Sequence, residues 1–90
     1  MWIKTADEDI LINVNASSGV IRIEGVDQVN NYCFPTDEDP VAYSIYMGHL
    51  RIGGFYSTHE LAIYALAKLV NDIQHDVKVI EVMKGDLGND

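Results

Sequence analysis

The chain has 90 residues, enough for one domain but too few for a deep catalytic cleft between layers, and 48% of its residues are apolar. With 22% charged residues, this composition is typical of a globular protein and excludes a disordered one. Fourteen acidic residues against six scattered basic ones give a formal net charge of -8, so direct binding to a nucleic-acid backbone is not expected.

The first part of the chain is predicted to form short strands joined by turns. Residues 2–4 open a strand, and the acidic residues 7–9 follow as a turn. Residues 10–15 then alternate apolar and polar side chains, which is typical of a half-buried strand. After a turn at residues 16–19, residues 20–25 alternate again, so the two stretches are predicted to pair as a hairpin.

The middle of the chain is predicted to hold a loop and a second hairpin. Residues 27–34 fit either a short strand or an irregular edge, and residues 35–40 are bracketed by two prolines that cannot pair inside a sheet. We therefore expect residues 35–40 to form an exposed loop. Residues 41–55 alternate again around Gly48-His49, and a glycine at the first central position suits a two-residue type II′ turn.

A helix is predicted to begin after the double glycine at residues 53–54. With Ser57 as N-cap, Glu60 takes the third helical position of a capping box, while Tyr56 and Leu61 are placed to form a hydrophobic staple. The arc predicted to face the sheet comprises Ala62, Ile63, Leu66, Leu69, Val70 and Ile73. The side predicted to face water comprises Glu60, Tyr64, Lys68, Asn71 and His75.

The double glycine does not match a phosphate-binding loop. A Walker loop needs Gly-x-x-x-x-Gly-Lys-Ser/Thr and a dinucleotide turn needs Gly-x-Gly-x-x-Gly, and neither string is present. The helix N-terminus still carries a partial positive charge, and Ser57, Thr58 and His59 could hydrogen-bond an anion there. A plain helix cap is the favoured interpretation.

The C-terminal part is predicted to return to the sheet. Residues 75–86 are predicted to form a strand with apolar residues on both faces. A strand of this kind indicates a homo-oligomer. The same is indicated by the sheet, because a single helix can cover only one of its two faces. The predicted fold is α+β in a single domain, residues 1–90. It is an antiparallel sheet of about five strands, made of two hairpins and a C-terminal strand and covered by one amphipathic helix.

No catalytic, metal or cofactor site is predicted. Cys33 could act as a nucleophile with His49, His59 or His75, but no oxyanion-forming stretch surrounds it, and a free cysteine is more often a small buried hydrophobic residue. The histidines are far apart, which excludes a structural zinc site, and residues 37–39 lack the glycine and glutamate of a calcium loop. The absence of secretion and membrane-spanning signals, together with a single cysteine, fits a reducing cytoplasm.

Two acidic triplets are candidate docking features. One is residues 7–9, and the other is formed by Asp37, Glu38 and Asp39. They would present compact negative patches that dock on a basic site of a partner. Solvated loops that keep a small protein soluble are the plainer alternative.

Aromatic residues complete the predicted binding surface. Tyr64 lies outside the apolar arc of the helix, and Tyr46 shares a strand face with alanine and serine, so both are expected to face solvent. With Tyr32 and Phe34 they could contact a protein or stack on a ring-bearing ligand. The alternative is packing along the sheet or across a homo-oligomer interface.

Three segments resemble small uncharacterised proteins of phages and mobile elements of Gram-positive bacteria: MWIKTADEDILINVN, IRIEG and LRIGGFYSTHELAIYALAKLVNDI. The shared pattern runs Trp-Ile, Leu-Ile-Asn, a sheet, then Gly-x-Tyr/Phe-x-Thr/Ser-x-Glu and a closing helix. It covers most of the chain except residues 35–40, and its matches are mostly structural positions. The resemblance implies a phage or prophage accessory protein that counters a host defence, and it carries over no catalytic residue.

Three functions are our hypotheses. The leading one is a non-enzymatic accessory protein that binds and inhibits a host defence factor through an acidic and aromatic surface, in the cytoplasm of a bacterial host. The second is an oligomeric sponge for a nucleotide-like signal, with tyrosines for stacking and Arg22, Arg51 or the Ser57-Thr58 cap for phosphate. The third is a structural or assembly protein.

Overall fold

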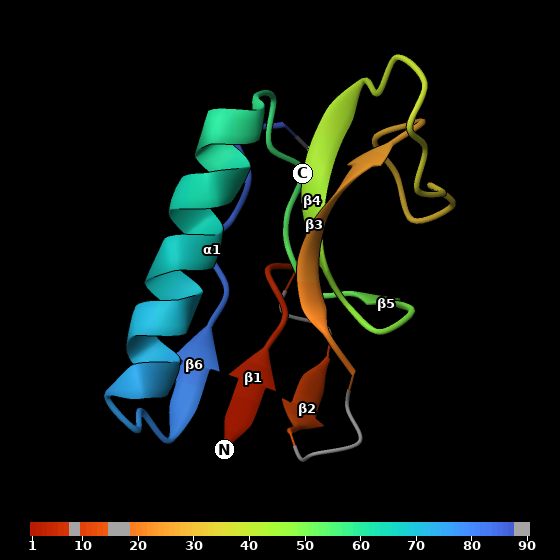
Figure 1. Cartoon of the computed structure of the whole chain (residues 1–90). Helices are drawn as coiled ribbons and strands as arrows, with labels where there is room; N and C mark the ends of the chain where they lie inside the picture. Colours follow the sequence, from red (N-terminus) through yellow and green to blue (C-terminus); the bar gives the residue numbers. More distant parts are fainter. Residues whose placement is uncertain (8–9, 15–18, 88–90) are drawn as a thin grey trace.

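The computed structural model describes residues 1–7, 10–14 and 19–87. The elements in chain order are β1 (Trp2–Lys4), β2 (Leu11–Asn13), β3 (Ile21–Val26), β4 (Ala42–Met47), β5 (Leu50–Arg51), α1 (His59–Gln74) and β6 (Val79–Glu81). The strands form two three-stranded sheets, β2-β1-β6 and β3-β4-β5, and α1 lies alongside both (Figure 1). The predicted α+β class is confirmed.

The prediction of one five-stranded antiparallel sheet is wrong. β2 pairs with β1 rather than with β3, with Ile12 opposite Ile3, so the predicted hairpin between residues 10–15 and 20–25 does not form. β3 instead pairs with all six residues of β4, and β6 joins β1 in parallel. Alternation indicates which faces of a strand are buried but not which strand is its partner, and the six-residue β4 offers β3 more ladder hydrogen bonds than β2 does. The predicted turn at residues 16–19 lies mostly outside the described residues.

The second predicted hairpin, residues 41–55, is confirmed, and its pairing extends to Tyr56. Met47 lies opposite Leu50, and Gly48 has a φ of 63°, as the first central residue of the predicted turn requires. The backbone N–H groups of Ile52 and Gly53 both donate to the carbonyl oxygen of Ile45, which is the pattern of a β-bulge. The hairpin then resumes beyond the double glycine at residues 53–54, where Tyr56 pairs with Tyr43.

The helix begins one residue later than predicted. Thr58, not Ser57, is the N-cap, and its hydroxyl oxygen accepts a hydrogen bond of 3.1 Å from the backbone N–H of Leu61. The predicted capping box and hydrophobic staple therefore do not form. Both residues carry a suitable hydroxyl, and tertiary contacts decide between them, because Tyr56 pairs with Tyr43 on β4 and holds the preceding backbone in an extended conformation.

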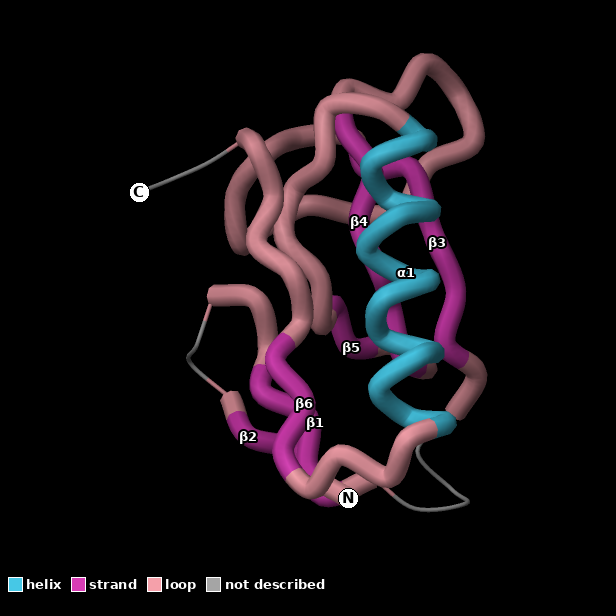
Figure 2. The backbone as a smooth tube through the Cα atoms, turned by 90° about the vertical axis from the view of Figure 1, so that its left-hand side faces the viewer, coloured by secondary structure: helices cyan, strands magenta, loops and turns pink. Residues whose placement is uncertain are grey.

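The buried face of α1 is narrower than the predicted arc. Its buried residues are Ala62, Ala65 and Leu69, while Ile63 and Val70 are exposed. The small alanine side chains let the helix lie close to both sheets, and this moves the contact face away from Ile63 and Val70. Figure 2 shows α1 running along β3 and β4, with β6 near its C-terminal end.

The main core lies between α1 and the two sheets. Its fully buried members are Ile3, Ile45, Ile52, Tyr56, Ala62 and Ile80. A smaller cluster on the other face of β4 contains Val26, Ala42, Tyr46 and Phe55. Within the described ranges, no helix has the length and apolar character needed to cross a bilayer.

Candidate functional site

The connection between β3 and β4, residues 27–41, carries the most exposed aromatic side chains of the described chain. We call it the 27–41 loop; it runs from orange to yellow at the upper right of Figure 1. Tyr32 is 80% exposed and Phe34 is 69% exposed, and the apolar side chains of Val29 and Val41 are exposed as well. Single exposed apolar residues are common on protein surfaces, but several large ones on one segment are typical of an interaction site.

Hydrogen bonds within the 27–41 loop fix its backbone. The Asp27 carboxylate accepts from the backbone N–H of Phe34 at 2.8 Å, and the Asn30 side-chain oxygen accepts from the N–H of Tyr32 at 2.7 Å. The Gln28 side chain donates to the carbonyl oxygen of Tyr32 at 2.8 Å. Side chains of the same loop therefore hold the backbone N–H and carbonyl of Tyr32 and the N–H of Phe34.

The base of the loop is tied to β3. Val26 and Pro35 form an antiparallel bridge, and the N–H of Thr36 donates to the carbonyl oxygen of Gly25 at 2.8 Å. Pro35 was expected to stay out of a sheet, but this bridge uses the N–H groups of Asp27 and Thr36 and needs no donor from proline. Residues 27–34 are thus an irregular turn that brings the chain back to β3.

The second acidic triplet lies in the same loop. Asp37, Glu38 and Asp39 are placed in it, and Thr36 holds the turn by accepting from the N–H of Glu38 at 3.1 Å. Residues 8–9 of the first triplet lie outside the described residues. Its first member, Asp7, accepts a hydrogen bond of 2.7 Å from the Thr5 hydroxyl, so that carboxylate helps to hold local structure.

Tyr46 is buried, which contradicts the prediction that it faces solvent. Only 5% of the residue is exposed, and its hydroxyl oxygen lies 3.6 Å from the Cys33 sulfur. The alternation of β4 assigned Tyr46 to a free face, but the 27–41 loop folds back over that face and Cys33 packs against it. Tyr64, at 64% exposure on α1, faces solvent as predicted but belongs to a different element from the loop.

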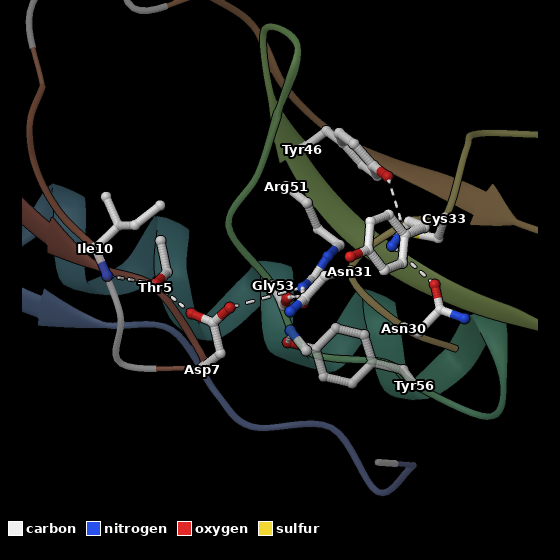
Figure 3. A network of polar contacts seen from close by, with 12 residues as sticks. Thr5, Asp7, Ile10, Asn30, Asn31, Cys33, Tyr46, Arg51, Gly53 and Tyr56 are labelled. Atoms are coloured by element: carbon white, nitrogen blue, oxygen red, sulfur yellow. Dashed lines mark hydrogen bonds and ion pairs between the residues drawn. The ribbon is translucent and has the colours of Figure 1, made fainter. Parts of the chain in front are cut away.

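The two arginines predicted to bind phosphate form hydrogen bonds and ion pairs with other residues of the protein. Arg22 pairs with Glu24 at 2.6 Å and donates to the Gly48 carbonyl oxygen. Arg51 donates to the carbonyl oxygen of Gly53, contacts the side chain of Asn31, and lies 3.7 Å from Asp7 (Figure 3). The structure therefore uses Arg51 to join the 27–41 loop to β5.

The helix N-terminus already has an acidic partner. The backbone N–H of Ser57 donates to the Asp86 carboxylate at 2.8 Å, and the Thr58 hydroxyl caps the helix. Hydrogen bonds from Ser57 hold the pKa of Asp86 below its usual value. A carboxylate of the chain itself thus already binds the predicted Ser57 site, at the backbone N–H that precedes the helix cap.

Cys33 and the histidines form no catalytic group in the described part of the chain. Cys33 contacts Tyr46 rather than a histidine, while His59 stacks edge-on against Tyr43 and His75 contacts the Asn71 carbonyl oxygen. Among the residues that the structure describes, no three His, Cys, Asp or Glu side chains converge to hold a metal ion. No family model, curated protein or solved structure matches the chain, so the choice of site rests on its geometry.

Two buried tyrosines are expected to make the stability of the fold depend on pH in the alkaline range. Burial raises the pKa of both Tyr46 and Tyr56 above the usual value of about 10. Their neutral forms stabilise the fold fully below about pH 10, and this stabilisation is lost as the pH rises further. We expect phenolate absorbance from these two residues to appear together with loss of the folded circular-dichroism signal, and Tyr46→Phe to shift unfolding to higher pH. Full ionisation of every tyrosine in a folded protein would contradict this assignment.

Proposed function

We propose that this chain is a non-enzymatic binding protein and that the 27–41 loop is its contact surface for a protein partner. The observation that carries the proposal is the exposure of Tyr32 and Phe34 on a loop whose backbone is fixed by its own side chains. Aromatic residues are enriched at binding hot spots and contribute little to stability when they are exposed. A loop that is ordered before contact loses little conformational entropy on binding.

The proposed partner is a bacterial protein with an apolar pocket inside a basic surface. Asp37, Glu38 and Asp39 lie in the same loop as the two exposed rings and would attract such a surface. The resemblance to phage and mobile-element proteins supports an accessory protein that inhibits a host defence factor in the bacterial cytoplasm. The rings would supply most of the affinity and the acidic residues would speed association.

The acidic part of this proposal is tested with two variants that change the net charge equally. Asp37→Asn/Glu38→Gln/Asp39→Asn removes the triplet, and Glu60→Gln/Asp76→Asn/Glu81→Gln removes three acidic groups from α1 and the segment after it. We expect the first variant to associate about tenfold more slowly with the captured partner and to lose most of its salt dependence. Equal effects of the two variants would show that only net charge matters, and would overturn a role for the triplet.

We also propose weak self-association through the outer face of sheet β2-β1-β6. The register places Trp2 beside Val79, and Leu11 beside Lys4, on the face opposite the buried Ile3. This face carries both Lys4 and Glu81, so two chains of net charge -8 can approach through it with little local repulsion. Sedimentation velocity is expected to show concentration-dependent association that Trp2→Ser abolishes. Unchanged association of Trp2→Ser would exclude this face.

A further inference from the structure

A groove of about 410 Å³ lies at the carboxyl ends of the two parallel strands, β1 and β6. Its walls are the residues that follow β1, the residues that follow β6, and the side of α1 that carries Lys68. None of these residues belongs to the 27–41 loop. The groove is therefore separate from the surface assigned to the protein partner, and a ligand in the groove would be bound whether or not the loop has that function.

The groove opens because two neighbouring chain segments diverge. The last hydrogen bond between them joins the N–H of Val82 to the carbonyl oxygen of Lys4 at 3.1 Å. Beyond it, Ala6 donates to the carbonyl oxygen of Ile52, while Met83 accepts from the buried Tyr56 hydroxyl. The diverging backbones leave a crevice at the carboxyl ends of these two strands, the same position at which open parallel α/β sheets bind ligands.

The chemistry of the groove combines two ammonium groups with an apolar floor. Lys68 on α1 and Lys84 after β6 both line it, although the whole chain has only six basic residues. The buried side chains of Ala6 and Val82, with Met83, supply the apolar surface. Its volume lies within the range of small-molecule sites, about 300–1,000 Å³.

We propose that this groove binds a small organic phosphate. Lys68 and Lys84 contact the phosphate, and the apolar floor packs against the organic part of the ligand. Glu81 also lines the groove, and Asp72 lies 3.4 Å from the Lys68 ammonium group, so these carboxylates weaken binding of a dianion and limit the site to modest affinity. The groups predicted from the sequence for phosphate, the two arginines and the helix cap, take no part.

The test is an NMR titration of the ¹⁵N-labelled protein with three probes: adenosine monophosphate, inorganic phosphate and adenosine. We expect adenosine monophosphate to shift the amide signals of Thr5, Ala6 and residues 82–84, with smaller shifts from phosphate and little from adenosine. Lys68→Gln/Lys84→Gln should weaken binding about tenfold. Lys78→Gln removes a lysine outside the groove and should leave affinity unchanged, while Glu81→Gln should tighten binding several-fold.

Three results would overturn the proposal. One is the absence of shifts in the groove at millimolar adenosine monophosphate. Another is an equal loss of affinity in Lys78→Gln, which would mean diffuse attraction to surface lysines. The third is equal binding of adenosine, which would mean that the phosphate is not recognised. If the double lysine variant does not fold, the two single variants and Glu81→Gln give the same discrimination.

Discussion

Gly85→Ala is expected to destabilise the fold by on the order of 3 kcal/mol and to detach the C-terminal segment from the hairpin. A Cβ atom at position 85 would overlap the backbone of Phe55, and one at position 54 would overlap the backbone of Gly85. The two segments pack backbone against backbone here, and Leu87 donates to the Phe55 carbonyl oxygen at 3.0 Å just beyond the contact. Neither backbone can move without breaking this pairing.

Urea denaturation of Gly85→Ala and of Lys78→Ala measures this effect. Lys78 is exposed and lies outside this backbone contact, so its truncation controls for the substitution itself and should change the free energy of unfolding by less than about 0.5 kcal/mol. A Gly85→Ala protein as stable as the wild type would mean that residues 82–87 do not pack against the hairpin as described.

Tyr56→Phe is expected to cost about 2 kcal/mol although it removes a single oxygen atom. Tyr56 is fully buried, its hydroxyl donates to the Met83 carbonyl oxygen at 2.5 Å, and it accepts from the Gly54 N–H at 3.2 Å. Phenylalanine fills the same space but leaves the partly buried Met83 acceptor and Gly54 donor without this partner. This cost far exceeds that of losing an exposed hydroxyl.

The same denaturation experiment on Tyr64→Phe provides the control. Tyr64 is exposed on α1, so loss of its hydroxyl should be close to neutral. If the two variants lost equal stability, the Tyr56 hydroxyl would not link the hairpin to the segment after β6. Because Met83 also lines the groove between β1 and β6, a loosened Tyr56→Phe protein should show amide shifts at residues 82–84 without any ligand.

Local structure can be predicted from the sequence where a residue type is tied to one backbone conformation. Glycine at position 48 is required by the positive φ of a tight turn, so the second hairpin could be placed from the sequence. The helix could be located from its period, but its first residue depends on the pairing of Tyr56 with Tyr43, which no local pattern indicates. β6 and β1 pair although they lie far apart in the sequence. The alternation of apolar and polar residues does not indicate which strand will be the partner of another.

The candidate site could be predicted only in part from the sequence. Tyr32 and Phe34 stand outside any alternating strand, which is why they could be expected at the surface. The sequence interpretation missed the ordered turn. Its signal was Asp27 and Asn30, because aspartate and asparagine side chains often hydrogen-bond to nearby backbone groups in turns. Tyr46 was misplaced because the covering of β4 by the 27–41 loop is a tertiary contact.

The groove could not be predicted from the sequence. Lys68 and Lys84 come from the helix and from the segment after β6, and only the parallel pairing of β1 with β6 brings their elements to one crevice. Neither residue belongs to a motif with fixed spacing. The sequence interpretation named Arg22 and Arg51 as phosphate ligands, but the structure uses them for internal contacts.

Capture of a partner from an extract of a Gram-positive bacterium tests the central claim most directly. The immobilised baits are the wild type, Tyr32→Ser/Phe34→Ser, and a control, Ile63→Ser/Tyr64→Ser, which removes two exposed apolar side chains from α1. We predict one protein that the wild type and the control retain equally, that associates more slowly at high salt, and that the loop variant fails to retain. Retention of the same protein by all three baits, or of none by the wild type, would contradict the assignment of the 27–41 loop as the contact surface.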